Sequence, residues 1–595
     1  MLCQYFLLLR IYKNYSYLAK LLGLVMNIKN MLINFTRSVS LIFGLLLFSS
    51  ATYAINEAEL ILSSNHVLLM TGERQSQPLS VAITDQRIVW IGDHQTAKTI
   101  KGTHINFGDQ AILPGFIDAH GHASYVAFAT QVANLASPPV GGVQTIADLQ
   151  LQLKNFIKEK EIGPGEWVIG LGYDDSLLKE QRHPTKKDLD VVSTSNPIYL
   201  IHVSSHLGAA NSLALSLADI TKDSLDPSGG KIRRLSGSTE PNGVFEETAA
   251  YPLQQLAMTS YKDPLGSVRE AMKIYARNGI TTAQDGAASL ESIALMQAAA
   301  AQGYLNLDVI TYPIGQGNTE ALIDSFAFGQ YQGRLKLGGI KLVLDGSPQG
   351  KTAYLTQPYL RPPHGQVADY KGYPLIPQTS VNDLVKTYSQ AGIPIMAHAN
   401  GDAAADMLIQ SIEEAGITSD HRTIMIHAQT VREDQLDQMK VLGIIPSYFS
   451  SHTFYWGDWH RDSVFGIDRA SRISPTRSTL ERDMLFTVHN DAPIVPPDMI
   501  RLLWSTTNRI TRSGRVLGED QKISTYDALK AMTVNAAYQH FEEETKGTIE
   551  VGKLADLVVL SQDPLNMPTS SLLRLKVIAT YSHGKEIFSV KKDAS

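Results

Sequence analysis

Two histidines stand one residue apart at the end of an apolar run, in the segment "AILPGFIDAHGHAS" at residues 111–124. In an extended strand, residues i and i+2 point to the same side, so we expect His120 and His122 to face one point. Two imidazole nitrogens at one point suit a single metal ion such as zinc. Two ligands do not complete a metal site, and the pair alone is equally compatible with exposed loop histidines.

Similar residues end three other apolar runs. His398 ends "IPIMAHA", His427 ends "TIMIHA", and Asp491 closes "MLFTVHNDAP". A single histidine on an apolar strand is usually a core residue, and an Asp at such a place is often a helix N-cap. The recurrence at equivalent positions of neighbouring segments favours one shared site. His489, two residues before Asp491, is predicted to be a core residue or a support for a ligand.

Lys341 in "GGIKLVLDGS" is unexpected, because burying an ammonium group in an apolar strand is costly. As a cation it cannot bind a metal. Its amine could pair with a carboxylate such as Asp345, lose its proton, or carry CO2 as a carbamate. The carbamate would turn a cation into a bridging carboxylate. The spacing alone favours the salt bridge.

The elements that must position these residues repeat along the middle of the chain. The apolar runs alternate with helix-like stretches, and they are "ILPGFIDAHGH", "GITTAQDG", "LNLDVITYPI", "GGIKLVLDG", "IPIMAHANGD", "TIMIHAQ", "IIPSYFS" and "MLFTVHNDAP". Buried parallel strands are almost continuously apolar, and strands that alternate with helices indicate βα units. About eight such units predict an α/β fold with a (β/α)8 TIM-type barrel, in which functional residues lie at the carboxyl ends of the strands.

Both ends of the chain differ from this middle. Short alternating strands are predicted within 55–113 and 547–595, for example in "LSVAITDQRIVWIGD" and "GKLADLVVLSQDP". We expect the two ends to build one small β-sandwich domain beside a barrel at 114–546, with two unrelated β extensions as the alternative. A segment at about 136–270, after the first barrel strand, is too long for a simple connection and predicts an inserted subdomain or lid.

The first 54 residues have the pattern of a leader. From Met26 they give a basic start, a short apolar core and a small-residue exit that ends at Ala54, which is typical of a signal peptide. The apolar core is short for a membrane span, so an uncleaved anchor is the less favoured alternative. Met26 is the expected true start, and we expect a periplasmic or secreted protein.

The composition excludes several functional classes. The formal net charge is −6, and no basic cluster follows the leader, which argues against nucleic acid as a partner. The only cysteine is Cys3, within the leader. A processed chain would therefore contain no disulfide, no thiolate metal ligand and no cysteine nucleophile.

Taken together, "GFIDAHGH", Lys341 and the three strand-end residues resemble the amidohydrolase superfamily. The similarity is greatest to its family 3 branch, which includes N-substituted formamide deformylase-like enzymes. Supporting segments are "IGLGYDDSLL", "SSHLGAANSLAL", "GVFEETA", "KLVLDGSPQGKTAYL", "FYWGDWHRDSVFGIDRASRISPTRS" and "GTIEVGKLADLVVL". The resemblance runs from about residue 57 to the C-terminus and implies a barrel that holds one or two divalent metal ions, with zinc expected.

The resemblance also implies residue roles. His120, His122 and Asp491 would bind the more buried ion, and His398 and His427 the second. A bound divalent ion makes water reactive at neutral pH and polarises a carbonyl. Asp491 would take the proton from that water and pass it to the departing amine.

At Lys341 the resemblance reverses the preference, because it implies a carboxylated lysine that bridges the two ions. Departures from the branch lie near the substrate instead. The branch often has tryptophans around "GYDD" and Gly-Ser before the last aspartate, where this chain has Leu177 and Leu178, and His489 and Asn490. Relatives of the D-aminoacylase type, which use a cysteine ligand, are excluded because Cys3 is in the leader.

Other candidate residues lie outside the barrel strands. His206 in "SSHLGAAN" is a candidate catalytic residue that could reach the substrate from the inserted segment, and a hydrogen-bonded structural histidine is the alternative. Trp456, Asp458 and His460, after the seventh strand, are candidate rim residues.

These inferences predict a metal-dependent hydrolase that cleaves a non-peptide C–N bond in a small amide, formamide or cyclic amide, with a cyclic imidate or an ester as close variants. The alternative is a non-catalytic periplasmic binding protein on the same barrel, and the intact ligand set with Asp491 favours the enzyme. We expect a small-molecule substrate, no nucleic acid and no stable membrane partner after leader removal, and a homodimer is left open.

Overall fold

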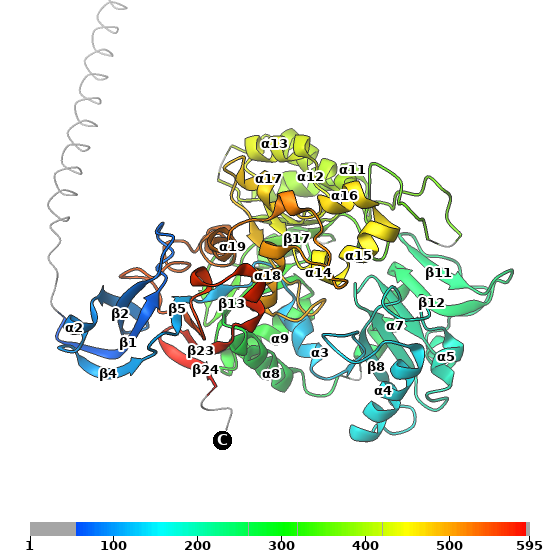
Figure 1. Ribbon diagram of the computed structural model, residues 1–595. Coiled ribbons are helices and arrows are strands. Elements are labelled where there is room, and N and C mark those ends of the chain that lie inside the picture. Colours follow the sequence, from blue (N-terminus) through cyan, green and yellow to red (C-terminus); the bar gives the residue numbers. More distant parts are fainter. Residues whose placement is uncertain (1–54, 260, 318, 364, 419, 591–595) are drawn as a thin grey trace, which may run out of the picture. The chain divides into compact units, whose positions relative to one another are not determined.

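The computed structural model describes residues 55–259, 261–317, 319–363, 365–418 and 420–590 (Figure 1). The predicted leader, with Cys3 and Met26, lies outside the described residues. Within the described part of the chain, no helix is both long enough and apolar enough to cross a membrane.

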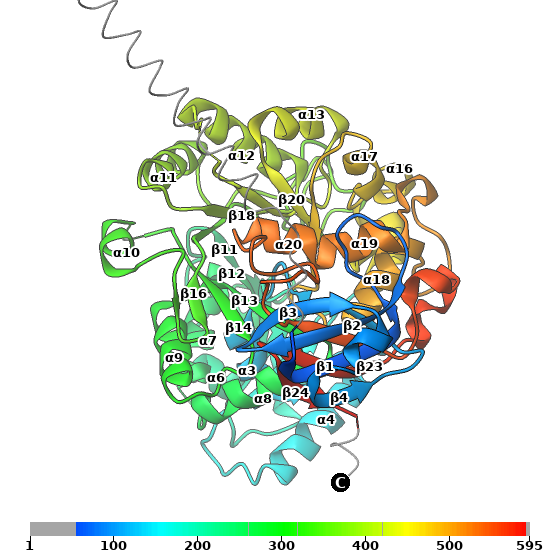
Figure 2. The ribbon, with the colours of Figure 1, turned by 90° about the vertical axis from the view of Figure 1, so that its left-hand side faces the viewer.

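Strands from the two ends of the chain pair in one sheet, as Figure 2 shows. The strands are β1 (Glu57–Val67), β2 (Gln77–Thr84), β3 (Arg87–Gly92), β4 (Lys101–Asn106), β5 (Ala111–Pro114), β22 (Leu557–Leu560), β23 (Val577–Ser582) and β24 (Lys585–Ser589). Their order is β24-β23-β22-β5-β1-β2-β3, with β4 beside β1. The ends join where β22 runs antiparallel to β5, with Val558 opposite Leu113. All eight strands belong to one hydrogen-bonded sheet, so the pairing does not distinguish the two layers of the predicted sandwich.

Each of the eight apolar runs of the middle contains a strand. They are β6 (Phe116–Ile117), β13 (Ile280–Ala288), β14 (Asp308–Pro313), β17 (Ile340–Val343), β18 (Ile395–Ala399), β19 (Ile424–His427), β20 (Ile445–Tyr448) and β21 (Thr487–Val488). Two short strands, β15 (Tyr331–Gln332) and β16 (Leu335–Leu337), follow β14. The α/β class is confirmed.

The strand pairing does not close into a ring of eight strands. The strands form two five-stranded sheets, β15-β16-β14-β13-β6 and β17-β18-β19-β20-β21. Isolated contacts link the sheets at both borders. Ile314 forms a parallel bridge to Lys341. At the other border, the Asp491 N–H donates to the His120 carbonyl at 3.1 Å.

Helices lie outside these strands (Figure 2). They include α3 (Ala123–Ala129), α8 (Pro264–Arg277), α9 (Leu290–Ala301), α11 (Gln378–Gln390), α12 (Asp402–Ala415), α13 (Glu433–Leu442), α18 (Met499–Asn508), α19 (Thr525–Met532) and α20 (Val534–Gln539). In α12 the buried residues Ala404, Leu408 and Ile412 recur every fourth position, so one apolar face covers the strands. Inside, one apolar layer joins β14, β18 and β19: Ile310, Tyr312, Met396, Ile424 and Ile426.

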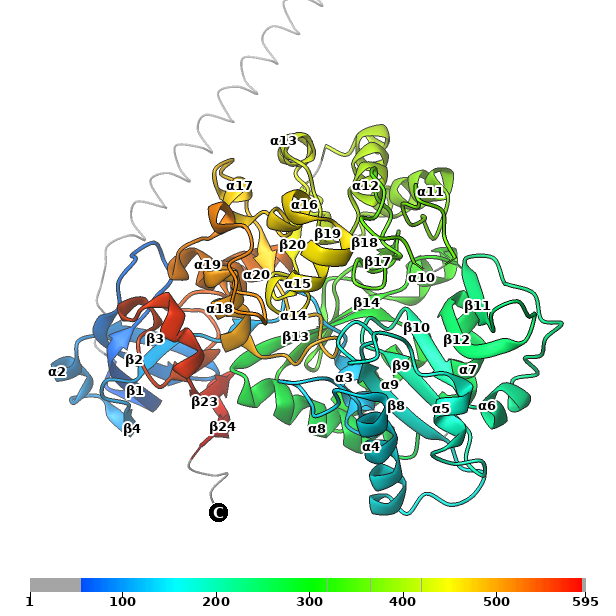
Figure 3. The same ribbon diagram turned by 45° about the vertical axis from the view of Figure 1, so that its right-hand side comes forward.

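The segment after the first barrel strand forms its own sheet (Figure 3). Its strands are β7 (Ala133–Asn134), β8 (Val168–Tyr173), β9 (Ile198–His202), β10 (Leu207–Ala210), β11 (Gly230–Arg234) and β12 (Pro241–Glu247), with helices α4 (Ile146–Glu159), α5 (Lys186–Asp190), α6 (Ser212–Leu217) and α7 (Tyr251–Met258). A capping box fixes the start of α4, because Thr145 and Asp148 each accept the other's backbone N–H. The predicted domain boundaries stay predictions, since Glu57–Ser595 is a single compact unit.

Candidate metal centre

The side chains of His120, His122 and Asp491 converge at the carboxyl ends of the first and eighth strands. Nε2 of His120 lies 3.3 Å from Asp491 Oδ1, and Nε2 of His122 lies 3.0 Å from the same oxygen. The backbones are held together as well, because the His122 N–H donates to the carbonyl of Ala492 at 2.8 Å. The structure thus brings together three residues that are separated by 369 positions between His122 and Asp491.

The other ring nitrogens of the two histidines face acceptors. Nδ1 of His120 contacts Gln284 Oε1 at 2.5 Å, and Nδ1 of His122 contacts the Gly286 carbonyl at 2.6 Å. Both Nδ1 atoms therefore donate a proton, and this selects the tautomer in which a metal-binding imidazole offers the lone pair of Nε2. Burial lowers the pKa of His120 well below its usual value, which keeps this ring neutral. A Cβ on Gly286 would lie 2.6 Å from His120 Cε1, so this approach requires glycine.

Two imidazole lone pairs and a carboxylate oxygen therefore meet at one point. All three groups are electron-rich, so the arrangement is unfavourable unless a cation lies among them. The donor set of two neutral imidazoles and one carboxylate is one that zinc and related divalent ions accept. The residues present thus fit a divalent metal ion.

His398 and His427 form a second pair of rings, with centroids 4.5 Å apart. Nδ1 of His398 lies 3.1 Å from Asp345 Oδ1, which fixes the proton on Nδ1 and the lone pair on Nε2. That Nε2 contacts the Asn400 amide nitrogen at 3.3 Å, a contact that a metal ion would replace. The ring of His427 is 5.6 Å from that of His120, so both pairs share one site.

The orientation of His427 does not follow from strand alternation. Ile424 and Ile426 face the inner apolar layer, and the alternation would turn His427 away from it. The backbone at His427 takes a φ of 69°, in the left-handed region. This conformation is strained for a residue other than glycine, and it lets the ring join His398 at the site.

Lys341 is buried at the same site, 1% exposed, with Nζ 3.2 Å from His120 Nε2. Burial lowers its pKa to about 7, opposed by the charge of Asp491. The salt bridge with Asp345 that the spacing favours is wrong. Asp345 accepts hydrogen bonds from the backbone of Asn400 and Gly401 and contacts His398 instead.

The comparisons with known proteins show the family of the chain. A family model described as the amidohydrolase family matches residues 105–588. The chain belongs to this family. Membership makes the protein an amidohydrolase, a metal-dependent hydrolase of carbon–nitrogen bonds.

Curated relatives match this amidohydrolase over most of their length. N-substituted formamide deformylase from Arthrobacter pascens is 28% identical, over 86% of this chain and 95% of the relative. Putative amidohydrolase YtcJ from Bacillus subtilis (strain 168) is 24% identical, over 88% of this chain and 98% of the relative.

Solved structures support the fold. An uncharacterized metal-dependent hydrolase from Pyrococcus horikoshii OT3 matches with a TM-score of 0.68 at 21% identity, over 86% of this chain and 99% of that chain. A second one, from Pyrococcus furiosus, gives a TM-score of 0.65 at 23% identity, over 85% of this chain and 100% of that chain.

The inserted subdomain of the amidohydrolase brings His206 to the metal centre. Its ring lies 5.6 Å from that of His398, and its Nδ1 is 2.8 Å from Glu247 Oε2. Burial lowers the pKa of His206, but the Glu247 carboxylate outweighs this and the net shift is upward. Glu247 has a φ of 49°, again a left-handed conformation at a residue other than glycine. Nothing in the sequence alone singled out Glu247 as the partner of His206.

The three candidate rim residues have partners within the protein. The indole of Trp456 donates to Asp174 at 2.7 Å. Asp458 accepts from the Ser513 hydroxyl at 2.7 Å, and His460 contacts His452 at 2.9 Å between ring nitrogens. These contacts fix the loop after the seventh strand.

A cavity of about 250 Å³ is lined by α3, by the inserted sheet and by the loops after β20 and β21. Its wall is largely apolar and includes Val126, Leu171, Leu177, Trp456, Pro493 and Ile494. None of the candidate metal ligands lines it, and Pro493, two residues after Asp491, is its nearest approach to them along the chain.

Proposed function

We propose that this amidohydrolase cleaves the C–N bond of a small amide, formamide or cyclic amide at the candidate metal centre. The observation that carries the proposal is the convergence of two imidazole lone pairs on Asp491 Oδ1, at 3.0 and 3.3 Å. This convergence places candidate metal ligands next to a carboxylate that can transfer protons, at the carboxyl ends of the barrel strands.

Some residues of the site would bind metal ions, and one would transfer protons. His120, His122 and Asp491 would hold one divalent ion, and His398 and His427 a second. A divalent ion in such a site makes water nucleophilic at neutral pH and polarises a carbonyl.

Asp491 accepts a proton from the attacking water and returns it to the amine nitrogen as the C–N bond breaks. A divalent ion bound beside Oδ1 of Asp491 would favour the ionised form of this carboxylate. The carboxylate would then be able to accept a proton.

Lys341 has the position of a ligand shared by both pairs. We infer that its amine bonds to the carbon of CO2 and releases a proton, which gives a carbamate. The resulting carboxylate would remove the cost of a buried cation and add a negative ligand. The Nζ distance of 3.2 Å from His120 Nε2 supports this assignment, because a free ammonium beside metal-binding nitrogens would oppose the ion.

The apolar cavity supports a substrate with an apolar substituent. A dry cavity of about 150 Å³ accommodates benzene in another protein, so one of about 250 Å³ has room for a single ring and its linker. The curated relative named N-substituted formamide deformylase is consistent with a formamide that carries such a group. His206, near His398, would contact the substrate carbonyl from the inserted subdomain.

We also propose zinc as the metal and export by the leader as the route to the periplasm or the medium. The alternative is a binding protein that has lost turnover. The intact set of ligands with Asp491 favours the enzyme.

A screen for amine release tests the proposal. Metal-loaded and chelator-treated protein are incubated with N-formyl and N-acyl amines that carry one-ring, linear or no apolar substituents. We expect metal-dependent release of the amine, fastest with one-ring substituents. A protein that keeps its metal and binds these compounds without releasing amine would be the binding protein instead.

A further inference from the structure

His489 is a buried imidazole that no part of the proposed function uses. It is 0% exposed, and neither of its ring nitrogens makes a hydrogen bond of good geometry, the backbone of Ser447 being its one weak polar contact. Leaving a buried polar group unpaired costs about 1–3 kcal/mol. An apolar side chain would avoid that cost, so a histidine here needs a partner that the protein itself does not supply.

Other buried histidines of the described chain have such partners. His202 contacts Ser204 through Nδ1 at 2.9 Å and Asp175 through Nε2 at 3.0 Å. His540 contacts the Tyr312 hydroxyl at 3.0 Å. The lack of a well-formed hydrogen bond at His489 is therefore not a general feature of buried imidazoles in this fold.

Backbone hydrogen bonds fix the segment that carries His489. Its N–H donates to the Tyr448 carbonyl at 3.0 Å, and two residues later the N–H of Asp491 donates to the His120 carbonyl at 3.1 Å. This segment lies just beyond the end of β21, and Asp491 takes a left-handed φ of 57°, so strand alternation does not decide where the His489 side chain points. The ring contacts of His489 decide it.

Ring contacts place His489 between the two halves of the site. Its ring centroid is 5.2 Å from that of His120 and 5.1 Å from that of His427. The ring pair of His120 and His122 is separated by 5.0 Å, so His489 is as close to a candidate ligand as the candidate ligands are to one another. On another side the ring of Phe449 lies at 5.2 Å and offers no polar atom.

We propose that His489 is an additional ligand of the metal centre, which binds through one ring nitrogen an ion held between the His120 and His427 sides. The proposal rests on the proposed function only in requiring that the site holds a divalent ion. A histidine adds a ligand without adding charge, so it tightens binding and leaves the positive charge of the ion undiminished for polarising a carbonyl.

Cobalt binding tests this assignment without reference to turnover. Metal-free wild-type protein and the variants His489→Leu and His489→Phe are titrated with Co²⁺ against a competing chelator, and the visible spectrum is recorded. Loss of a group that merely supports a metal ligand weakens metal affinity by about 10- to 100-fold, so we expect at least that loss, with a changed spectrum. His540→Leu is the matched control, since it removes a buried imidazole away from the site and should leave affinity unchanged.

The outcomes separate this inference from the proposed function. If wild-type protein binds no Co²⁺, the metal centre itself is wrong. If wild-type protein binds Co²⁺ and both variants match its affinity and spectrum, His489 is not a ligand. A variant that loses turnover but keeps its Co²⁺ affinity and spectrum also contradicts the inference. Should neither variant fold, a crystal structure of Co²⁺-loaded wild-type protein decides, with a nitrogen of His489 expected about 2.0–2.1 Å from the ion; a distance beyond 3 Å, roughly, overturns the proposal.

Discussion

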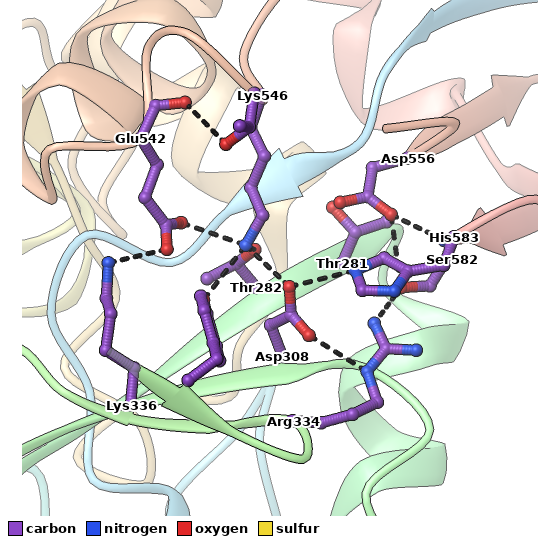
Figure 4. Close-up of polar contacts among 12 residues, drawn as sticks. Thr281, Thr282, Asp308, Arg334, Lys336, Glu542, Lys546, Asp556, Ser582 and His583 are labelled. Carbon is purple, nitrogen blue, oxygen red and sulfur yellow. Dashed lines mark hydrogen bonds and ion pairs between the residues drawn. The ribbon is translucent and has the colours of Figure 1, made fainter. Parts of the chain in front are cut away.

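Two clusters of buried ionisable residues lie at opposite ends of the barrel strands, and they are built differently. The candidate metal centre is at the carboxyl ends. The second, which we call the ionic cluster, is near the start of β14 and β16, where the chain ends join the barrel (Figure 4). Its members are Asp308, Arg334, Lys336, Glu542, Lys546, Asp556 and His583.

In the ionic cluster, protein cations sit between the carboxylates. Nζ of Lys546 lies 2.6 Å from Asp308 and 2.9 Å from Glu542 (Figure 4). Lys336 contacts Glu542 at 2.6 Å, and Arg334 contacts Asp308 at 2.9 Å. The two lysines and Arg334 thus balance the buried carboxylates that they contact.

Clustering of ligand-type atoms alone does not identify a metal site. Atoms of Asp308, Asp556 and His583 come within 4.8 Å of one another, as those of His120, His122 and Asp491 do. The ionic cluster already contains its positive charge, whereas at the metal centre two imidazole lone pairs face a carboxylate. The difference predicts catalysis at one end and stability at the other, as is general for this type of barrel.

Matched substitutions of aspartate sharpen this comparison most strongly. Asp491→Asn removes a ligand and the proton acceptor together, so we expect kcat/KM for amide hydrolysis to fall by about 10³-fold or more. Asp308→Asn, in the ionic cluster, should leave the rate per folded molecule within about threefold of wild type. Equal losses in the two variants would remove the functional distinction between the clusters.

Lys546→Met should show the opposite behaviour. It leaves Asp308 and Glu542 buried without their shared cation, and breaking a buried ion pair in this way costs about 3–5 kcal/mol. The free energy of unfolding from urea denaturation measures the loss, and the metal content of the folded protein should not change. Lys522→Met, at a more exposed lysine paired with Glu519, is the control and should shift stability by less than about 0.5 kcal/mol.

Metal removal should affect only the candidate metal centre, at the carboxyl ends of the barrel strands. Chelation is expected to abolish turnover and to lower the free energy of unfolding, by about 2.7 kcal/mol relative to protein with free metal at 100 times its dissociation constant. Added Zn²⁺ or Co²⁺ should restore both. The same difference between metal-loaded and metal-free protein is expected in Lys546→Met, and a difference that vanishes there would show that the clusters are coupled.

The smallest effect concerns acid stability. Burial raises the pKa of Glu542, but Lys546 and Lys336 outweigh it and lower that pKa to about 2 from the ordinary 4.5. A depressed pKa in the folded state contributes stability that is complete above pH 4.5 and is lost as the pH falls toward 2. Glu542→Gln should reduce the slope of unfolding free energy against pH in this window, by at most about 1.4 kcal/mol per pH unit. An unchanged slope would mean that folding does not lower the pKa of Glu542.

Part of this arrangement follows from local sequence patterns. The apolar runs predict the strands, and their last residues predict which side chains gather, because the carboxyl ends of parallel strands meet at one face. The i, i+2 spacing likewise predicts that His120 and His122 lie together, and they do, although β6 ends at Ile117. These inferences need only the periodicity of a strand.

Other features depend on contacts that no local pattern encodes. His427 reaches the site through a left-handed backbone conformation that contradicts strand alternation. Asp345 turns beyond the end of its strand to contact His398, although the spacing favours Lys341 as its partner. The ionic cluster joins Asp308 to Lys546 across 238 positions, a pairing that only the folded chain reveals.

Anomalous scattering from a crystal of metal-loaded protein tests the central claim most directly, because it locates the ion without assuming its ligands. We predict a peak at the absorption edge of the metal among His120, His122 and Asp491, and none beside Asp308 and Asp556. A peak in the ionic cluster, or none at the carboxyl ends of the strands in a metal-replete crystal, would contradict the account.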